Sequence, residues 1–291
     1  MRVWRAWTAL WAEREHPVSL GLVRIGLGLC VLVDALVVRG LGLVHPLFGP
    51  ELEGGLVGAA PWVESLGPGN VHGVLTLAAL GLTVGCFTRT SALILLGVWA
   101  QLGVAAPFAD RAVDLLARDV LAVLALSGAG AWASVDAAWS TGSLWGDGRP
   151  VGAWARRLIV AQLALLYGGA GLTKVDASWW PWGGASALFV VLQDPAVTRT
   201  SFAFLREGGW RLTQVATVVT VVWQLLWPLV VVWMALGWTR FRRLGDRLHA
   251  VWLAVGLAFH LTLAATMELG LFPWCMMALY PALIAPRHLR R

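Results

Sequence analysis

The stretch that decides the fold is VSLGLVRIGLGLCVLVDALVV, residues 18–38, which carries only two charged side chains, Arg24 and Asp34. A helix of this length would extend about 31 Å, which matches the hydrocarbon thickness of a bilayer. Seven further apolar runs follow, at roughly 71–87, 91–108, 113–131, 155–173, 213–236, 249–267 and 269–285. The sequence therefore predicts an all-α fold, a polytopic membrane bundle of about eight transmembrane helices.

The composition of the chain agrees with a membrane location. Apolar residues make up 58% of its 291 residues and charged residues 13%, against roughly 25% charged in a soluble domain. These values exclude a cytosolic globule and a disordered tail. The net charge of +6 falls between the apolar runs rather than on one basic face, so we expect no nucleic-acid partner. We expect a single transmembrane domain over residues 1–291, with no soluble C-terminal domain.

The distribution of basic residues predicts the orientation. With both termini in the cytoplasm, 14 of the 22 basic residues fall in inner segments and six in outer ones, which is the bias expected of a membrane protein. Before the first run, Trp4, Trp7 and Trp11 recur at i, i+3 and i+7, which predicts a short amphipathic helix on the inner leaflet. We expect an integral protein of a bacterial cytoplasmic membrane with both termini inside.

Metal and haem sites are not indicated. Cys30, Cys86 and Cys275 lie far apart and form no C-x-x-C pair, so we interpret them as small buried apolar residues. His260 falls near the middle of the seventh run, but His72 and His249 fall at opposite membrane edges. A facing histidine at matched depth is missing, and His260 is either a hydrogen-bonded core residue or part of another kind of site.

Polar side chains inside the apolar runs are costly and need partners. Arg24 and Asp34 are ten residues apart, about 15 Å along a helix, so they cannot pair, and we expect Arg24 to snorkel toward the inner surface. Asp114 and Arg118 are spaced i, i+4, which predicts an ion pair between them. Gln224 lies near mid-membrane, where we expect it to bond another helix.

Lys174 is the only lysine, since the other 21 basic residues are arginine. Lysine can lose its proton when desolvated, whereas arginine stays charged. Tyr167, Ala170, Gly171 and Lys174 are spaced i, i+3, i+4, i+7 and share one helix face. The two small residues could form a groove with a polar group at each end, or they could permit close helix packing, in which case Lys174 would merely snorkel outward.

The fifth run and its continuation resemble the segment of vitamin K-dependent γ-glutamyl carboxylases that holds their catalytic lysine. The matching residues are Tyr167, Ala170, Gly171, Lys174, Val175, Asp176, Ala177 and Trp179. A second segment, from His260 through Gly270-Leu271-Phe272-Pro273-Trp274 to Pro281, resembles those proteins without a gap. Weaker similarity lies in Arg24-Ile25-Gly26 and Ser134-Val135-Asp136. The resemblance covers nearly the whole chain and corresponds to the HTTM membrane domain.

The resemblance implies eight or nine helices and a site near the outer face. In the carboxylases the lysine deprotonates vitamin K hydroquinone, and oxygen then converts the quinol to an epoxide through a strong base that removes a γ-proton of a peptide glutamate. It implies catalytic roles for Lys174 and His260. It implies cofactor-binding roles for a further six residues: Tyr167, Ala170, Gly171, Trp179, Asp114 and Gln224.

The implied cofactor is vitamin K hydroquinone or menaquinol, with no metal. The lumenal domain that recognises the substrate in the carboxylases has no counterpart in these residues, so we do not expect the chain to carboxylate glutamate by itself. The expected partners are a quinone or lipid and a secreted peptide or soluble partner protein. The alternative is a non-catalytic HTTM protein that binds lipid or peptide as a maturation or immunity factor. The sequence leaves both open and leans toward an enzyme.

Overall fold

The computed structural model describes residues 2–49, 61–229 and 242–289. Most of the described residues are helical, which confirms the all-α prediction. The chain divides into two compact units: Met1–Ile159 with Trp274–Arg291, and Val160–Pro273. The last part of the predicted sixth run, 230–236, lies outside the described residues.

The first unit contains most of the helices. Up to the second strand its elements are α1 (Arg2–Ala12), β1 (Arg14–Glu15), α2 (Val18–Gly40), α3 (Val44–Phe48), α4 (Pro61–Val84), α5 (Thr88–Ala105), η1 (Pro107–Ala109), α6 (Ala112–Leu126), η2 (Ala129–Ala131), α7 (Val135–Thr141) and β2 (Val151–Gly152). It also holds the start of α8 (Trp154–Leu172), most of α13 (Phe272–Leu279), η6 (Tyr280–Leu283) and α14 (Pro286–Leu289).

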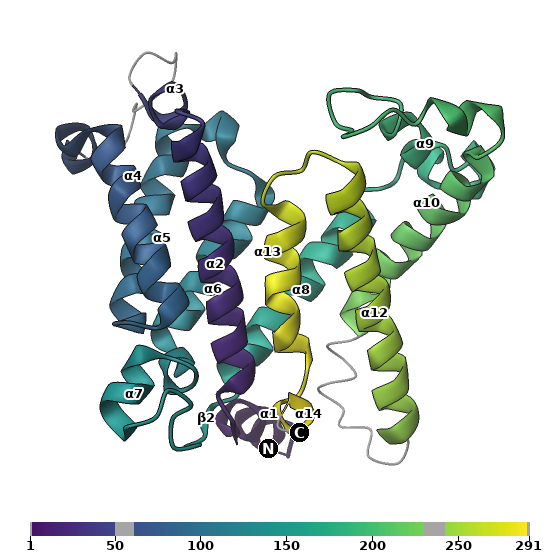
Figure 1. Ribbon diagram of the computed structural model, residues 1–291. Helices are drawn as coiled ribbons and strands as arrows, with labels where there is room; N and C mark the ends of the chain where they lie inside the picture. Colours follow the sequence, from purple (N-terminus) through teal and green to yellow (C-terminus); the bar gives the residue numbers. More distant parts are fainter. Residues whose placement is uncertain (1, 50–60, 230–241, 290–291) are drawn as a thin grey trace. The chain divides into compact units, whose positions relative to one another are not determined.

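Helices α2, α4, α5 and α6 lie side by side in this unit (Figure 1). Their facing sides bury apolar residues such as Leu27, Leu82, Leu95 and Leu121. The outer side of α2 instead exposes large apolar residues, among them Leu29, Val33, Leu36 and Val37. Apolar residues on both sides are typical of a helix that faces lipid on one side and protein on the other.

The N-terminal segment is fastened to the start of α8. Strands β1 and β2 pair antiparallel, with Glu15 opposite Val151. The guanidinium of Arg156 donates to both carboxylate oxygens of Glu15, at 2.7 and 2.9 Å, and to the Ala282 carbonyl at 3.0 Å. Helix α1 confirms the helix predicted before the first apolar run.

The second unit contains the rest of α8 and the long segment that follows it. Its other elements are η3 (Ala177–Trp179), η4 (Pro181–Gly183), α9 (Ala187–Val191), η5 (Ala203–Glu207), α10 (Trp210–Leu225) and α12 (Arg242–Thr266). Leu192, Leu205 and Met267 form a small apolar core beneath this segment. Backbone bonds from Arg199 to Thr266 and from Glu268 to Val197 tie the segment to the end of α12.

Each of the eight predicted runs contains a helix in its described part. Three helices in the described residues are long and apolar enough to cross a membrane: Val18–Gly40, Thr88–Ala105 and Trp210–Leu229. Two shorter apolar helices are Ala250–Thr266 and Phe272–Leu283. Helix α4 begins at Pro61, ten residues before the predicted run, and is interrupted at Gly67, where φ is 75°.

Arg24 does not snorkel, so that prediction is wrong. Its side chain is fully buried and donates to the carbonyls of Leu82 (2.8 Å), Thr83 (2.9 Å), Trp132 (3.3 Å) and Ala133 (2.5 Å). We call this arrangement the Arg24 clamp. It joins α2 to the end of α4 and to the segment before α7, so both terminal nitrogens of the guanidinium bond inside the protein rather than at the membrane surface. The Arg24 Nε is buried without a partner among the described residues.

The segment Ser134-Val135-Asp136 directly follows two of the carbonyls that Arg24 bonds, those of Trp132 and Ala133. Ser134 caps α7 by accepting from the Ala137 backbone N–H, and Asp136 accepts from the N–H groups of Phe87 and Thr88 at the start of α5. Gly85 sits between them with φ of 68°, and a Cβ there would lie 2.3 Å from Ser134 and 2.4 Å from Arg24. Only glycine fits this turn.

Candidate functional site

Lys174 lies two residues beyond the C-terminal end of α8. Its Nζ donates to the Ala170 carbonyl at 2.8 Å and lies 4.9 Å from the centroid of the Trp179 ring. The Trp180 indole N–H donates to the Lys174 carbonyl at 2.9 Å and fixes the backbone after the helix. The structure therefore brings together three of the predicted site residues: Lys174, Ala170 and Trp179.

The ammonium of Lys174 has no acidic partner among the described residues, because no carboxylate there lies within 4.0 Å. The neighbouring Asp176 instead accepts from the Ser178 backbone N–H at 2.8 Å. Burial lowers the pKa of Lys174 below its usual value, because a desolvated ammonium loses part of its hydration and no carboxylate nearby compensates for it. The neutral amine is therefore more favoured at Lys174 than at an ordinary surface lysine.

Tyr167 and His260 form a buried pair. The Tyr167 hydroxyl and the His260 Nε2 are 2.5 Å apart, and the two side chains are 2% and 0% exposed. Tyr167 stacks on Trp227 with ring centroids 4.4 Å apart and meets Trp223 edge-on at 4.9 Å. His260 therefore lies against Tyr167, another predicted site residue, and joins α12 to α8 within an aromatic cluster.

Gly171 supports the packing alternative rather than the groove. A Cβ at this position would lie 3.0 Å from the side chain and the backbone nitrogen of Leu225. Close approach of α8 and α10 therefore occupies the space that a groove would need at this residue. At Gly169, by contrast, a Cβ would meet nothing within 4 Å.

Gln224 is buried, but its Oε1 has no hydrogen-bond partner within residues 2–49, 61–229 and 242–289. The expected bond from Gln224 to another helix is thus not found in the described structure. Trp223 and Trp227 flank it, and their indole nitrogens are also buried without a partner there. Sequence reasoning missed the part that Trp227 plays, although the i, i+4 spacing of Trp223 and Trp227 indicates one aromatic face.

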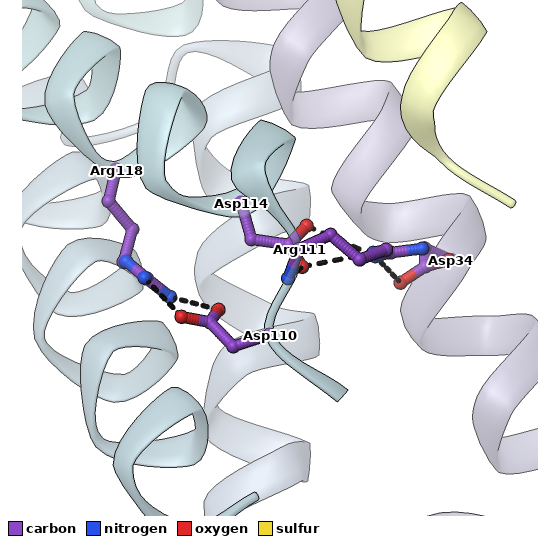
Figure 2. Close-up of polar contacts among 5 residues, drawn as sticks. All are labelled: Asp34, Asp110, Arg111, Asp114 and Arg118. Carbon is purple, nitrogen blue, oxygen red and sulfur yellow. Dashed lines mark hydrogen bonds and ion pairs between the residues drawn. The ribbon is translucent and has the colours of Figure 1, made fainter. Parts of the chain in front are cut away.

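Asp114 belongs to the first unit, and its predicted pairing with Arg118 is wrong. Figure 2 shows that Asp114 instead pairs with Arg111, at 3.0 and 3.1 Å, while Arg118 turns to Asp110, with two bonds of 2.7 Å. Asp110 and Arg111 directly precede α6. From there the Asp110 carboxylate bonds Arg118, and the Arg111 guanidinium bonds Asp114. Asp34 lies 3.8 Å from Arg111.

None of the curated proteins and none of the solved structures matches the chain. The sequence profile of the HTTM domain matches residues 13–287. The chain is therefore a membrane protein of the HTTM domain family, the domain found in vitamin K-dependent γ-carboxylases.

Proposed function

We propose that this protein is a membrane enzyme that uses a reduced quinone, with Lys174 as the general base. The observation that carries the proposal is the placement of the only lysine. Lys174 is partly buried, held by a backbone carbonyl and an aromatic ring, and has no carboxylate partner in the described part of the chain. A lysine kept for its charge alone would be expected to have an acidic partner or full hydration.

Two effects on the Lys174 amine compete. The Trp179 ring favours the ammonium by about 0.5–2 kcal/mol, as cation–π contacts do, whereas burial favours the neutral amine. Burial lowers the pKa of Lys174, and the proposal requires this effect to exceed that of the ring. The neutral base is present above that pKa and is lost as the pH falls through it, so a lowered pKa extends the active range of the base toward neutral pH.

The quinol, when bound, would supply an acidic hydroxyl and the reducing equivalents for reaction with oxygen. Lys174 accepts the proton of that hydroxyl at Nζ. Leu172, Val175 and Trp182 have exposed apolar side chains in the same segment, which suits an isoprenoid tail that approaches from lipid. Ala170 and Trp179 hold the amine in place from either side.

Tyr167 and His260 take a positioning role in this proposal. Their hydrogen bond fixes α8 against α12, and Tyr167 lies seven residues before Lys174 in the chain. The proposal does not use Gly171, which packs on Leu225, or Asp114, whose carboxylate is occupied by Arg111. The acceptor is a peptide or a soluble partner protein.

The same proposal includes the topology. Eight membrane-crossing segments with both termini in the cytoplasm account for the bias of basic residues toward the inner segments. They place Lys174 at the outer end of the fifth segment. Helices in the described part of all eight runs support this count, and the exposed apolar side of α2 supports contact with lipid.

A second candidate is a non-catalytic protein that binds lipid or peptide as a maturation or immunity factor. It is favoured by the closed packing on the face before Lys174, where Tyr167 bonds His260 and Gly171 meets Leu225. Mass spectrometry of quinones that copurify with the protein separates the two. An enzyme should retain a quinone and convert its reduced form on exposure to oxygen, whereas a non-catalytic protein should leave any bound quinone unchanged.

A further inference from the structure

A cavity of about 230 Å³ lies within the first unit, and the proposed function does not use it. It is bounded by residues of α2 to α6 and the turn before α6. The ionisable residues that line it are Asp34, His72, Asp110, Arg111 and Asp114. Trp99 lines it with an aromatic ring.

The charges around this cavity do not balance. Arg118 is fully engaged by Asp110, and Arg111 makes two bonds to Asp114, as Figure 2 shows. Asp34 is left with a single contact of 3.8 Å to Arg111, a cation already bonded elsewhere. Of the three carboxylates drawn, Asp34 is therefore the one without a close guanidinium partner. The further cation near His72, Arg39, donates to the Gly69 carbonyl at 3.1 Å.

His72 provides a second and independent indication of a ligand. Its side chain is 2% exposed, and its Nδ1 has no hydrogen-bond partner in the described residues although it lines the cavity. A buried polar atom without a partner has lost its hydration for nothing in return, so native proteins rarely leave one. In the tautomer protonated at Nε2, the His72 Nδ1 is a hydrogen-bond acceptor. The Asp34 carboxylate is also an acceptor, so a ligand that bonds both groups must carry N–H or O–H donors.

The side chains that line the cavity and its volume further restrict the class of ligand that fits. The rings of Trp99 and Phe48 line it, and aromatic faces attract cations. The described residues contain no group of three histidine, cysteine or acidic side chains that could hold a metal ion. The volume also exceeds that of a bare ion and is just below the range of about 300–1,000 Å³ typical of small-molecule pockets.

We propose that this cavity binds a primary ammonium group, with Asp34 as the counter-charge and His72 as a second acceptor. The group belongs to a small soluble amine or to the headgroup of an aminolipid, which share this chemistry. Asp34 takes one N–H in a charge-assisted hydrogen bond, His72 Nδ1 takes another, and the aromatic walls cover the adjoining carbon chain. The inference does not depend on Lys174 or on any quinone.

The test is calorimetric titration of the purified full chain, in phosphatidylcholine nanodiscs, with butylammonium. Two matched probes accompany it: tetramethylammonium, which keeps the charge but has no N–H, and butanol, which keeps the chain but has no charge. Wild type should bind butylammonium in preference to both. Asp34→Asn should weaken binding about 10-fold to 100-fold, as expected for loss of a hydrogen bond to a charged group.

Asp147→Asn is the matched control, because Asp147 pairs with Arg149 in an exposed loop of the same unit, and it should bind as wild type does. If Asp34→Asn does not fold, His72→Phe carries the test with an expected weakening of about 3-fold to 10-fold. Weaker butylammonium binding in phosphatidylethanolamine nanodiscs would identify the lipid headgroup as the natural source, and equal binding would identify a soluble amine. Equal binding by wild type and both variants, equal binding of the three probes, or no binding to wild type would overturn the proposal.

Discussion

The Arg24 clamp makes the most quantitative prediction about the fold. Replacing Arg24 by Met keeps a long apolar stem but removes the guanidinium, which donates to four backbone carbonyls. The Leu82 carbonyl keeps a second partner, the Gly85 N–H at 3.2 Å, whereas those of Thr83, Trp132 and Ala133 lose the bond that holds them in place. A buried acceptor that loses its donor costs about 1–3 kcal/mol. Three such carbonyls are left, and removal of the buried charge offsets part of their cost.

We therefore expect Arg24→Met to lower the free energy of unfolding by about 3–5 kcal/mol, measured by reversible denaturant titration in detergent micelles. Arg24→Lys should recover only part of the loss, because an ammonium has three donors at one point and cannot span both pairs of carbonyls as a planar guanidinium does. Arg149→Met is the control, since Arg149 is 88% exposed and should change little. A cost for Arg24→Met within about 0.5 kcal/mol of the control would refute the clamp.

Three further outcomes follow from the second unit and the topology. Tyr167→Phe removes the buried hydrogen bond to His260 and should lower the free energy of unfolding by about 1–3 kcal/mol. An unchanged free energy of unfolding would mean that this bond contributes nothing to stability. Gly171→Leu should force α8 from α10 and lower the unfolding midpoint, whereas Gly169→Leu has open space and should be tolerated; equal effects would contradict the packing. In a background without native cysteines, an impermeant maleimide should label Val190→Cys on whole cells and Trp145→Cys only after lysis. Both native side chains are well exposed, at 61% and 63%. The reverse labelling pattern would show that the topology is inverted.

The helical class and most helix positions could be predicted from the sequence, because apolar run length is a local property. The start of α4 could not. Pro61 to Asn70 is rich in glycine and proline and reads as a loop, yet it forms a helix that is interrupted at Gly67. Helical structure here depends on packing, for instance of buried Val63, which overrides local preference.

The partners of buried charges were the least predictable feature. Arg24 bonds carbonyls 108 and 109 residues away, and no spacing rule reaches that far. Arg118 bonds Asp110 rather than Asp114 because the turn before α6 brings an earlier carboxylate into range. Lys174 was identified by its rarity and its position at the end of a helix, both of which are visible in sequence.

The central claim is that Lys174 acts by giving up its proton. The measurement that tests it is oxygen-dependent epoxidation of menaquinol by wild type, Lys174→Arg and Lys174→Ala, each checked for folding and for quinone retention. Arginine keeps the charge but cannot act as a base, since its pKa exceeds about 12. The proposal predicts that both variants lose about 10²–10⁴-fold in rate while still binding quinone. Full activity in Lys174→Arg, or no epoxidation by wild type, would contradict it.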